Sequence, residues 1–219
     1  MLECIELETG PRPTGSVIWL HGLGADGHDF EPIVPELVGA GERALRFVFP
    51  HAPVRPVTIN GGFAMRAWYD IASLERHAAQ DLAGIRASQA EVVRLIDREV
   101  ARGIRPSHVV LAGFSQGGAL AIYTGTRFAQ PLAGILGLSS YALQSDRFER
   151  ERSAANRTTP VFLAHGSQDP VVPPELGHEL RQLLENAGCP VEWHSYAIPH
   201  AVCPEELTHV AVWLRRVLN

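Results

Sequence analysis

Short apolar segments alternate with helical periodicities along most of the chain, and this alternation limits the possible folds more than any other feature. Six segments of five to seven residues, most of them nearly continuous in apolar residues, are candidate strands: 16–20, 45–49, 108–114, 133–139, 161–165 and 191–197. Strands that are apolar on both sides are typical of a parallel sheet covered on both faces. The pattern therefore predicts an α/β fold with a mostly parallel central sheet and helices on both faces.

Three windows, two between these segments and one after the last of them, carry apolar residues at helical spacing: 80–102, 174–188 and 204–218. Gly103 and Gly188 follow the apolar stripes of the first two windows and are candidate C-caps. Pro204 stands where the first turn of the third helix is expected, a position that suits proline. The first two windows place helices between strands, as right-handed crossover units require, and the third places a helix after the last strand.

The remaining segments indicate a single domain, residues 1–219. The segment 2–7 alternates apolar and polar residues, which is typical of an exposed edge strand. Residues 50–67 are rich in Pro and Gly, and residues 140–159 are polar, so both are expected to be irregular. Neither is long enough for a separate lid domain.

Composition excludes several classes of protein. A hydrophobic fraction of 46% suits one compact domain, and a net charge of −5 without a basic stripe argues against a nucleic-acid partner. The N-terminus lacks the pattern of a signal peptide, and no apolar run approaches the length of a membrane span, so stable membrane insertion is not expected. Three widely spaced cysteines indicate reduced thiols and a cytoplasmic location.

The stretch Gly113-Phe114-Ser115-Gln116-Gly117 contains the most informative motif, Gly-x-Ser-x-Gly, between an expected strand and an expected helix. A sharp strand-to-helix turn forces its central residue into an unfavourable backbone conformation, and bulky neighbours would clash there. Glycines at 113 and 117 remove those clashes. Ser115 is therefore the candidate nucleophile, held at the N-terminus of a helix whose free N–H groups favour negative charge.

A Ser hydroxyl is a weak nucleophile, so it needs a basic His that is oriented by a carboxylate. On this scaffold the expected chain order is Ser, acid, His, each at the carboxyl end of a strand. Two Asp residues follow Ser115 in the chain. Asp169 is favoured because it lies in a turn directly after the apolar segment 161–165, whereas Asp146 lies in a polar segment.

Five His residues follow the nucleophile: His165, His178, His194, His200 and His209. His200 alone lies in the loop between the last expected strand and the last expected helix, so it is the candidate base. The others are interpreted as structural. No His-Glu-x-x-His motif is present, and no metal site or cofactor is expected.

An oxyanion hole needs two N–H donors. The backbone N–H of Gln116 is one candidate, and the N–H of Leu23, in the loop after the first apolar segment, is the other. That loop lacks the glycine spacing of a dinucleotide site and the Gly-Lys of a P-loop, so phosphate binding is disfavoured. His21 is interpreted as a brace for the loop.

Five motifs in this order, HGLGADGHDF, MRAWYDI, GFSQGG, HGSQDPVVP and HAVCPEEL, resemble the phospholipase/carboxylesterase family of α/β-hydrolases, which includes small carboxylesterases and acyl-protein thioesterases. The resemblance covers essentially the whole chain and implies an α/β-hydrolase fold without a lid domain. It implies triad roles for Ser115, Asp169 and His200, and oxyanion roles for Leu23 and Gln116. Pro199 and Ala201 depart from the residues that many relatives have beside the His.

The family places part of its acyl-binding wall at 61–71, where Phe63, Met65 and Trp68 are large and apolar. The alternative is that these side chains only pin a long loop to the core. We expect a carboxylesterase that cleaves esters of short to medium acyl chains through an acyl-enzyme. An acyl-protein thioesterase or lysophospholipase using the same site is the alternative, and a non-catalytic binding module is the alternative of a different class. The expected partner is a small-molecule ester or thioester, and the sequence leaves a homodimer open.

Overall fold

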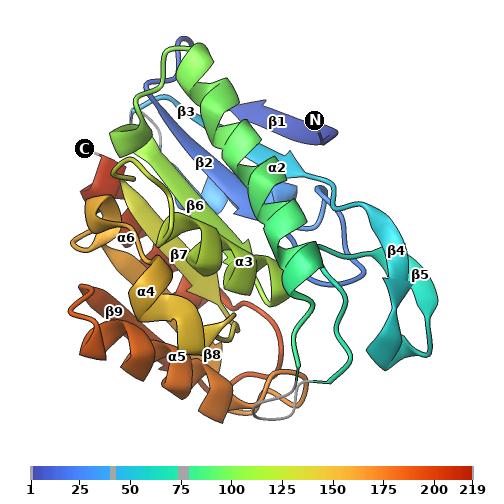
Figure 1. Ribbon diagram of the computed structural model, residues 1–219. Helices are drawn as coiled ribbons and strands as arrows, with labels where there is room; N and C mark the ends of the chain where they lie inside the picture. Colours follow the sequence, from blue (N-terminus) through green and yellow to red (C-terminus); the bar gives the residue numbers. More distant parts are fainter. Residues whose placement is uncertain (1, 40–42, 74–78, 219) are drawn as a thin grey trace.

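The computed structural model describes residues 2–39, 43–73 and 79–218, which form a twisted seven-stranded sheet between two layers of helices (Figure 1). The strands of the sheet are β1 (Cys4–Glu8), β2 (Gly15–Leu20), β3 (Leu45–Pro50), β6 (Val109–Phe114), β7 (Gly134–Leu138), β8 (Val161–Gly166) and β9 (Val191–Tyr196). Their spatial order is β1-β3-β2-β6-β7-β8-β9. Only β1 pairs antiparallel, with β3, and it forms one edge. The expected strands, the edge strand included, are confirmed.

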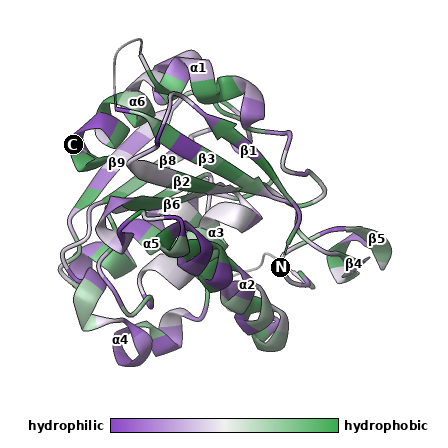
Figure 2. Cartoon of the chain, turned by 90° about the horizontal axis from the view of Figure 1, so that it is seen from above, coloured by the Kyte–Doolittle hydropathy of each residue, from purple (hydrophilic) through white to green (hydrophobic). Residues whose placement is uncertain are grey.

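Helices cover both faces of the sheet, and their apolar sides face inward (Figure 2). On one face lie α2 (Leu82–Ala101), α3 (Gln116–Gly125), α4 (Phe148–Glu151) and α5 (Pro174–Asn186). On the other lie α1 (Val34–Leu37) and α6 (Pro204–Leu218). Short 3-10 turns occupy Glu31–Ile33, Thr58–Asn60, Pro106–His108, Ser145–Arg147 and Ala154–Asn156. Two core layers result, one on each face, as the near-continuous apolar strands require.

The helix ends follow the capping chemistry of the sequence. Gly103 and Gly188, just beyond α2 and α5, have φ angles of 94° and 77°, a left-handed conformation that glycine adopts without a steric penalty. At the start of α2, the carboxylate of Asp81 accepts the backbone N–H of Gly84 at 2.9 Å. The expected helix positions are confirmed.

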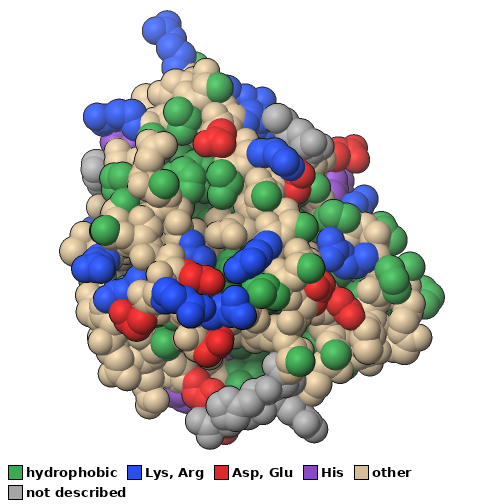
Figure 3. All heavy atoms as spheres, in the orientation of Figure 1, with side chains coloured by type: hydrophobic (Ala, Val, Ile, Leu, Met, Phe, Trp, Pro, Cys, Tyr) green, Lys and Arg blue, Asp and Glu red, His purple; other side chains and the backbone are tan. Residues whose placement is uncertain are grey.

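The segment 50–67 is wrongly predicted as irregular, because it contains an antiparallel hairpin of β4 (Val54–Val57) and β5 (Phe63–Arg66). The hairpin projects from the body of the molecule, outside the main sheet (Figure 1). Val54 and Phe63 are 63% and 70% exposed on it, and apolar side chains gather over this region (Figure 3). The chain thus places an apolar, solvent-facing hairpin beside the edge where the parallel strands end.

Parallel strands end at one edge of a sheet, and this edge collects the candidate site residues. Leu23 follows β2, Ser115 follows β6, Asp169 follows β8 and His200 follows β9. Ligands of open α/β sheets bind outside the carboxyl ends of the strands, so the topology alone brings these four positions into one region.

Candidate active site

Ser115 occupies the strained turn that the motif predicts. Its φ and ψ are 54° and −121°, a region that non-glycine residues rarely adopt, and its N–H donates to the carbonyl of Leu138 at 2.8 Å. A Cβ on Gly113 would lie 2.4 Å from the carbonyl carbon of Gly117, and one on Gly117 would lie 2.3 Å from the carbonyl oxygen of Leu20. Both glycines are therefore required for β2, β6 and α3 to approach so closely.

His200 and Asp169 form a buried hydrogen-bonded pair. The ring Nδ1 of His200 donates to Oδ2 of Asp169 at 2.6 Å, and the other carboxylate oxygen accepts the backbone N–H groups of Val171 and Val172 at 2.8 and 2.9 Å. The Asp169 side chain is 0% exposed and that of His200 15%. Because a carboxylate accepts, the proton of a neutral His200 lies on Nδ1, which leaves Nε2 bare to accept a proton.

The His200 ring lies over the strand end that carries Ser115. Its centroid is 4.7 Å from that of Phe114, the residue directly before Ser115. A Cβ on Gly166 would lie 2.4 Å from the carbonyl oxygen of Ile198, so the end of β8 packs directly on the backbone of the His200 loop. This close contact fixes the loop relative to the sheet.

Sequence reasoning missed the contact between His165 and the candidate acid, Asp169. The His165 ring is 1% exposed, and Nε2 donates to the carbonyl of Val172 at 3.0 Å and lies 3.5 Å from Oδ2 of Asp169. Burial lowers the pKa of His165, which keeps the ring neutral. It therefore anchors the turn that carries the acid from beneath. The position of His165, at the end of the strand before Asp169, was the feature of the sequence that could have predicted this contact.

The two candidate oxyanion donors come from two segments, the loop after β2 and the start of α3. A Cβ on Gly22 would lie 3.5 Å from the Cβ of Ser115, so the loop after β2 passes close to the candidate nucleophile. The N–H of Gly24 donates to the carbonyl of Arg66, whereas the N–H of Leu23 has no acceptor among the described residues. Gln116 is the first residue of α3, where an N–H lacks an intrahelical acceptor.

The three expected wall residues lie in different surroundings. Trp68 is fully buried, and its indole N–H donates to the carbonyl of His21 at 2.9 Å, which fits the alternative that it pins the loop. Phe63 is 70% exposed on the hairpin. Met65 is half-buried, and its Sδ would lie 3.6 Å from a Cβ on Gly24. Met65 thus lies beside the loop that carries the candidate donor Leu23, and it is less buried there than Trp68.

The residues set aside in the sequence lie elsewhere or are committed to other partners. The Asp146 side chain is 77% exposed and lies 3.9 Å from Arg147. His194 pairs with Glu192 at 3.0 Å, and Nδ1 of His209 lies 2.8 Å from the hydroxyl of Tyr196. Within residues 2–39, 43–73 and 79–218, no group of three His, Cys, Asp or Glu residues is arranged to hold a metal ion, and no helix is long and apolar enough to cross a membrane.

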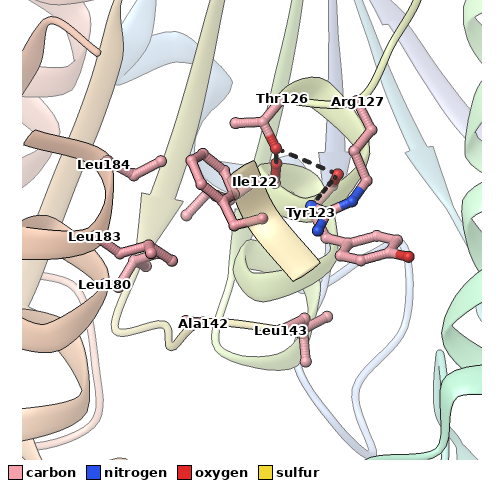
Figure 4. Close-up of a pocket in the computed structure, with 10 residues that line it drawn as sticks. Ile122, Tyr123, Thr126, Arg127, Ala142, Leu143, Leu180, Leu183 and Leu184 are labelled. Atoms are coloured by element: carbon pink, nitrogen blue, oxygen red, sulfur yellow. Dashed lines mark hydrogen bonds between the residues drawn. The ribbon is translucent and has the colours of Figure 1, made fainter. Parts of the chain in front are cut away.

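A small hollow opens between α3 and α5, away from this site (Figure 4). It is lined by side chains that include Ile122, Arg127, Leu143, Leu180 and Leu184. Ile122 lies seven residues along from Ser115, roughly 10 Å at the rise of a helix. Nε of Arg127, one of its lining residues, donates to Glu151 at 3.1 Å.

Comparison with known proteins places this geometry in context. The model of the phospholipase/carboxylesterase family matches residues 4–218. Acyl-protein thioesterase 1 of Gibberella zeae is 39% identical over 214 residues, which cover 94% of this chain and 91% of the relative. The structure of SOBER1 from Arabidopsis thaliana is 30% identical with a TM-score of 0.88 and covers 94% of this chain and 99% of its own. Acyl-protein thioesterase 2 of Zea mays is 28% identical with a TM-score of 0.85, covering 98% and 99%.

Proposed function

The chain belongs to the phospholipase/carboxylesterase family of α/β-hydrolases, and from this premise we propose that it is a thioesterase that removes acyl groups from cysteine side chains of proteins. The similarity to acyl-protein thioesterases favours a thioesterase over a carboxylesterase, whereas the sequence alone favoured the carboxylesterase. The hydrogen bond between His200 and Asp169, at the sheet edge that carries the strained Ser115, is the observation that supports covalent catalysis.

The reaction proceeds through an acyl-enzyme. Nε2 of His200 takes the proton of the Ser115 hydroxyl as Oγ attacks the carbonyl carbon, and the N–H groups of Leu23 and Gln116 stabilise the resulting oxyanion. Collapse of the tetrahedral intermediate breaks the carbon–sulfur bond, and the leaving thiolate takes the proton from His200. Water then attacks the acyl carbon while His200 takes its proton. Collapse of this second tetrahedral intermediate breaks the bond between the carbon and Oγ of Ser115, and His200 returns the proton to Oγ, which releases the carboxylic acid and free Ser115.

Matched substrates separate the hypotheses. We expect kcat/KM for an S-acyl-cysteine peptide to exceed that for the O-acyl-serine peptide of the same sequence and acyl chain. An equal or higher value for the oxygen ester would favour the carboxylesterase. A preference for lysophospholipid over both peptides would favour the lysophospholipase.

The nucleophile is tested separately. Ser115→Ala should lower kcat by about 10⁵-fold or more. A fluorophosphonate should label Ser115, as located by mass spectrometry. Ser139 is a matched control, because it also follows a parallel strand with a positive φ of 47° but does not begin a helix. Labelling of Ser139 would contradict the assignment, and a wild-type protein that reacts with neither substrate nor label would favour the non-catalytic binding module.

A further inference from the structure

The peptide group between Gly22 and Leu23 is held by the side chain of His21. Nδ1 of His21 lies 2.7 Å from the carbonyl oxygen of Gly22, and Nε2 lies 3.0 Å from the backbone nitrogen of Ala52. The ring is 1% exposed. The carbonyl of His21 itself accepts the indole N–H of Trp68 at 2.9 Å, so the preceding peptide group is held as well.

These partners fix the tautomer of His21. A backbone N–H can only donate, so Nε2 accepts from Ala52 and carries no proton. The proton therefore lies on Nδ1 and is donated to the carbonyl of Gly22, which can only accept. Burial lowers the pKa of His21 to about 4, which agrees with a ring that stays neutral at neutral pH.

The direction of the Gly22 carbonyl determines the direction of the Leu23 N–H. In a trans peptide the C=O and N–H bonds point in opposite directions, and no peptide bond among the described residues is cis. The same carbonyl also accepts the N–H of Ala25 at 3.3 Å, which closes a turn with Gly24 at a φ of 79° in its third position. The Leu23 N–H is thereby turned away from His21 and left without an acceptor within the described residues.

We propose that His21 is a positioning residue for the oxyanion hole: by donating Nδ1–H to the Gly22 carbonyl, it holds the Leu23 N–H in the direction that binds the oxyanion. This inference rests on the proposed function, in which Leu23 is one of the two donors. His21 touches no reacting atom. Its contribution is made in the tetrahedral intermediate and in the transition states on either side of it, because the bound substrate carries no oxyanion.

Two substitutions separate the two ring nitrogens. In His21→Asn the side-chain amide reaches the position of Nδ1 and keeps a donor for Gly22, but nothing reaches Ala52. In His21→Gln the amide reaches the position of Nε2 and keeps an acceptor for Ala52, but the donor to Gly22 is lost. His51→Gln is the matched control, because Nδ1 of His51 accepts the N–H of Gly27 in the same loop at 3.0 Å without contacting the Gly22–Leu23 peptide.

The readouts are kcat, KM and the inhibition constant of a trifluoromethyl ketone that carries the acyl chain of the substrate and forms a tetrahedral adduct with Ser115. Active enzyme is counted by fluorophosphonate titration, so misfolded protein does not enter the rates. Loss of a full oxyanion donor costs about 10²–10³-fold in kcat, so misdirecting one in His21→Gln should cost roughly 10- to 100-fold. The inhibition constant should rise by a similar factor, and KM should change by less than about threefold.

His21→Asn should keep kcat within roughly fivefold of wild type, and His51→Gln within roughly threefold, whatever their stabilities. Wild-type kcat in titrated His21→Gln, or equal losses in His21→Gln and His51→Gln, would overturn the positioning role while leaving the hydrolase intact. Equal losses in His21→Gln and His21→Asn would also overturn it, because bracing alone would then explain both. A wild-type protein without turnover and without ketone binding would overturn the proposed function and this role together.

Discussion

Glu206, in the first turn of α6, is a carboxyl group buried close to the His200 loop. Its residue is 1% exposed, and Oε1 has no hydrogen-bond partner among the described residues. The backbone N–H of Cys203 interacts with the carboxyl group, but burial outweighs this interaction and raises the pKa of Glu206 to about 7, against an ordinary value of 4.5. The folded protein therefore holds this proton more tightly than the unfolded chain.

This difference sets the sign of a stability change with pH. Between pH 4.5 and about 7 the folded state binds more protons at Glu206, so the free energy of unfolding falls as the pH rises. Above pH 7 both states are ionised, and the folded state carries the whole cost of the buried charge. The difference of about 2.5 pKa units, at about 1.36 kcal/mol each, makes this cost roughly 3 kcal/mol.

Glu206→Gln should remove the cost, because glutamine keeps the shape and an acceptor for Cys203 but cannot ionise. Urea unfolding at pH 5 should give nearly equal free energies for wild type and variant, and at pH 8.5 the variant should be more stable by roughly 2–3 kcal/mol. Glu205→Gln, in the same turn but exposed, should show no such divergence. A difference between Glu206→Gln and wild type that is constant with pH, or a wild type that is the more stable at pH 8.5, would refute the reasoning.

Two further predictions concern the site itself. Asp169→Asn should stay folded but lose roughly 10³–10⁴-fold in kcat, because the orientation and charge stabilisation of His200 are lost. Near-normal kcat in this variant would contradict the triad. Across acyl chains from C2 to C16, kcat/KM should rise for a few carbons and then level off. Met65→Ala should lower kcat/KM selectively for the longer substrates, whereas Trp68→Ala should lower it for all chain lengths alike. A loss in Trp68→Ala that is confined to longer chains would instead make Trp68 part of the acyl-binding wall.

The sequence predicted the architecture because the signals that define it are local. Apolar runs in β2, β6, β7 and β8 follow directly from burial on both faces, and Gly103 and Gly188 mark helix ends through a backbone angle that other residues adopt at a cost. The position of Ser115 was predictable for the same reason. The glycines on both sides of Ser115 indicate a turn in which larger side chains would clash.

Contacts between distant segments were not predictable in this way. The support of Asp169 by His165 depends on where the turn after β8 folds back, and the periodicity of apolar residues does not predict the path of that turn. The hairpin of β4 and β5 was missed because Pro56 and the paired glycines are typical of a break. In the structure Gly61 and Gly62, both with positive φ, complete the connection between its strands, after the 3-10 turn Thr58–Asn60. The role of Trp68 could not be predicted from the sequence, because a large apolar side chain in an irregular segment can either line the acyl-binding site or pack in the core.

Gln116 connects the chemistry of the sheet edge to the segment that departs from it. Its backbone N–H is a candidate oxyanion donor, while its side chain accepts the N–H of Trp68 at 2.9 Å and donates to the carbonyl of Tyr69 at 2.8 Å. Tyr69 in turn lies 2.8 Å, hydroxyl to hydroxyl, from Tyr141, in the loop after β7. The root of the hairpin segment is therefore fixed to the turn that carries Ser115 by buried hydrogen bonds, and exposed side chains such as Phe63 lie beyond that anchor. Substitutions on the exposed hairpin should accordingly change which acyl compounds bind without moving the oxyanion donors, whereas substitutions at its root should affect every substrate.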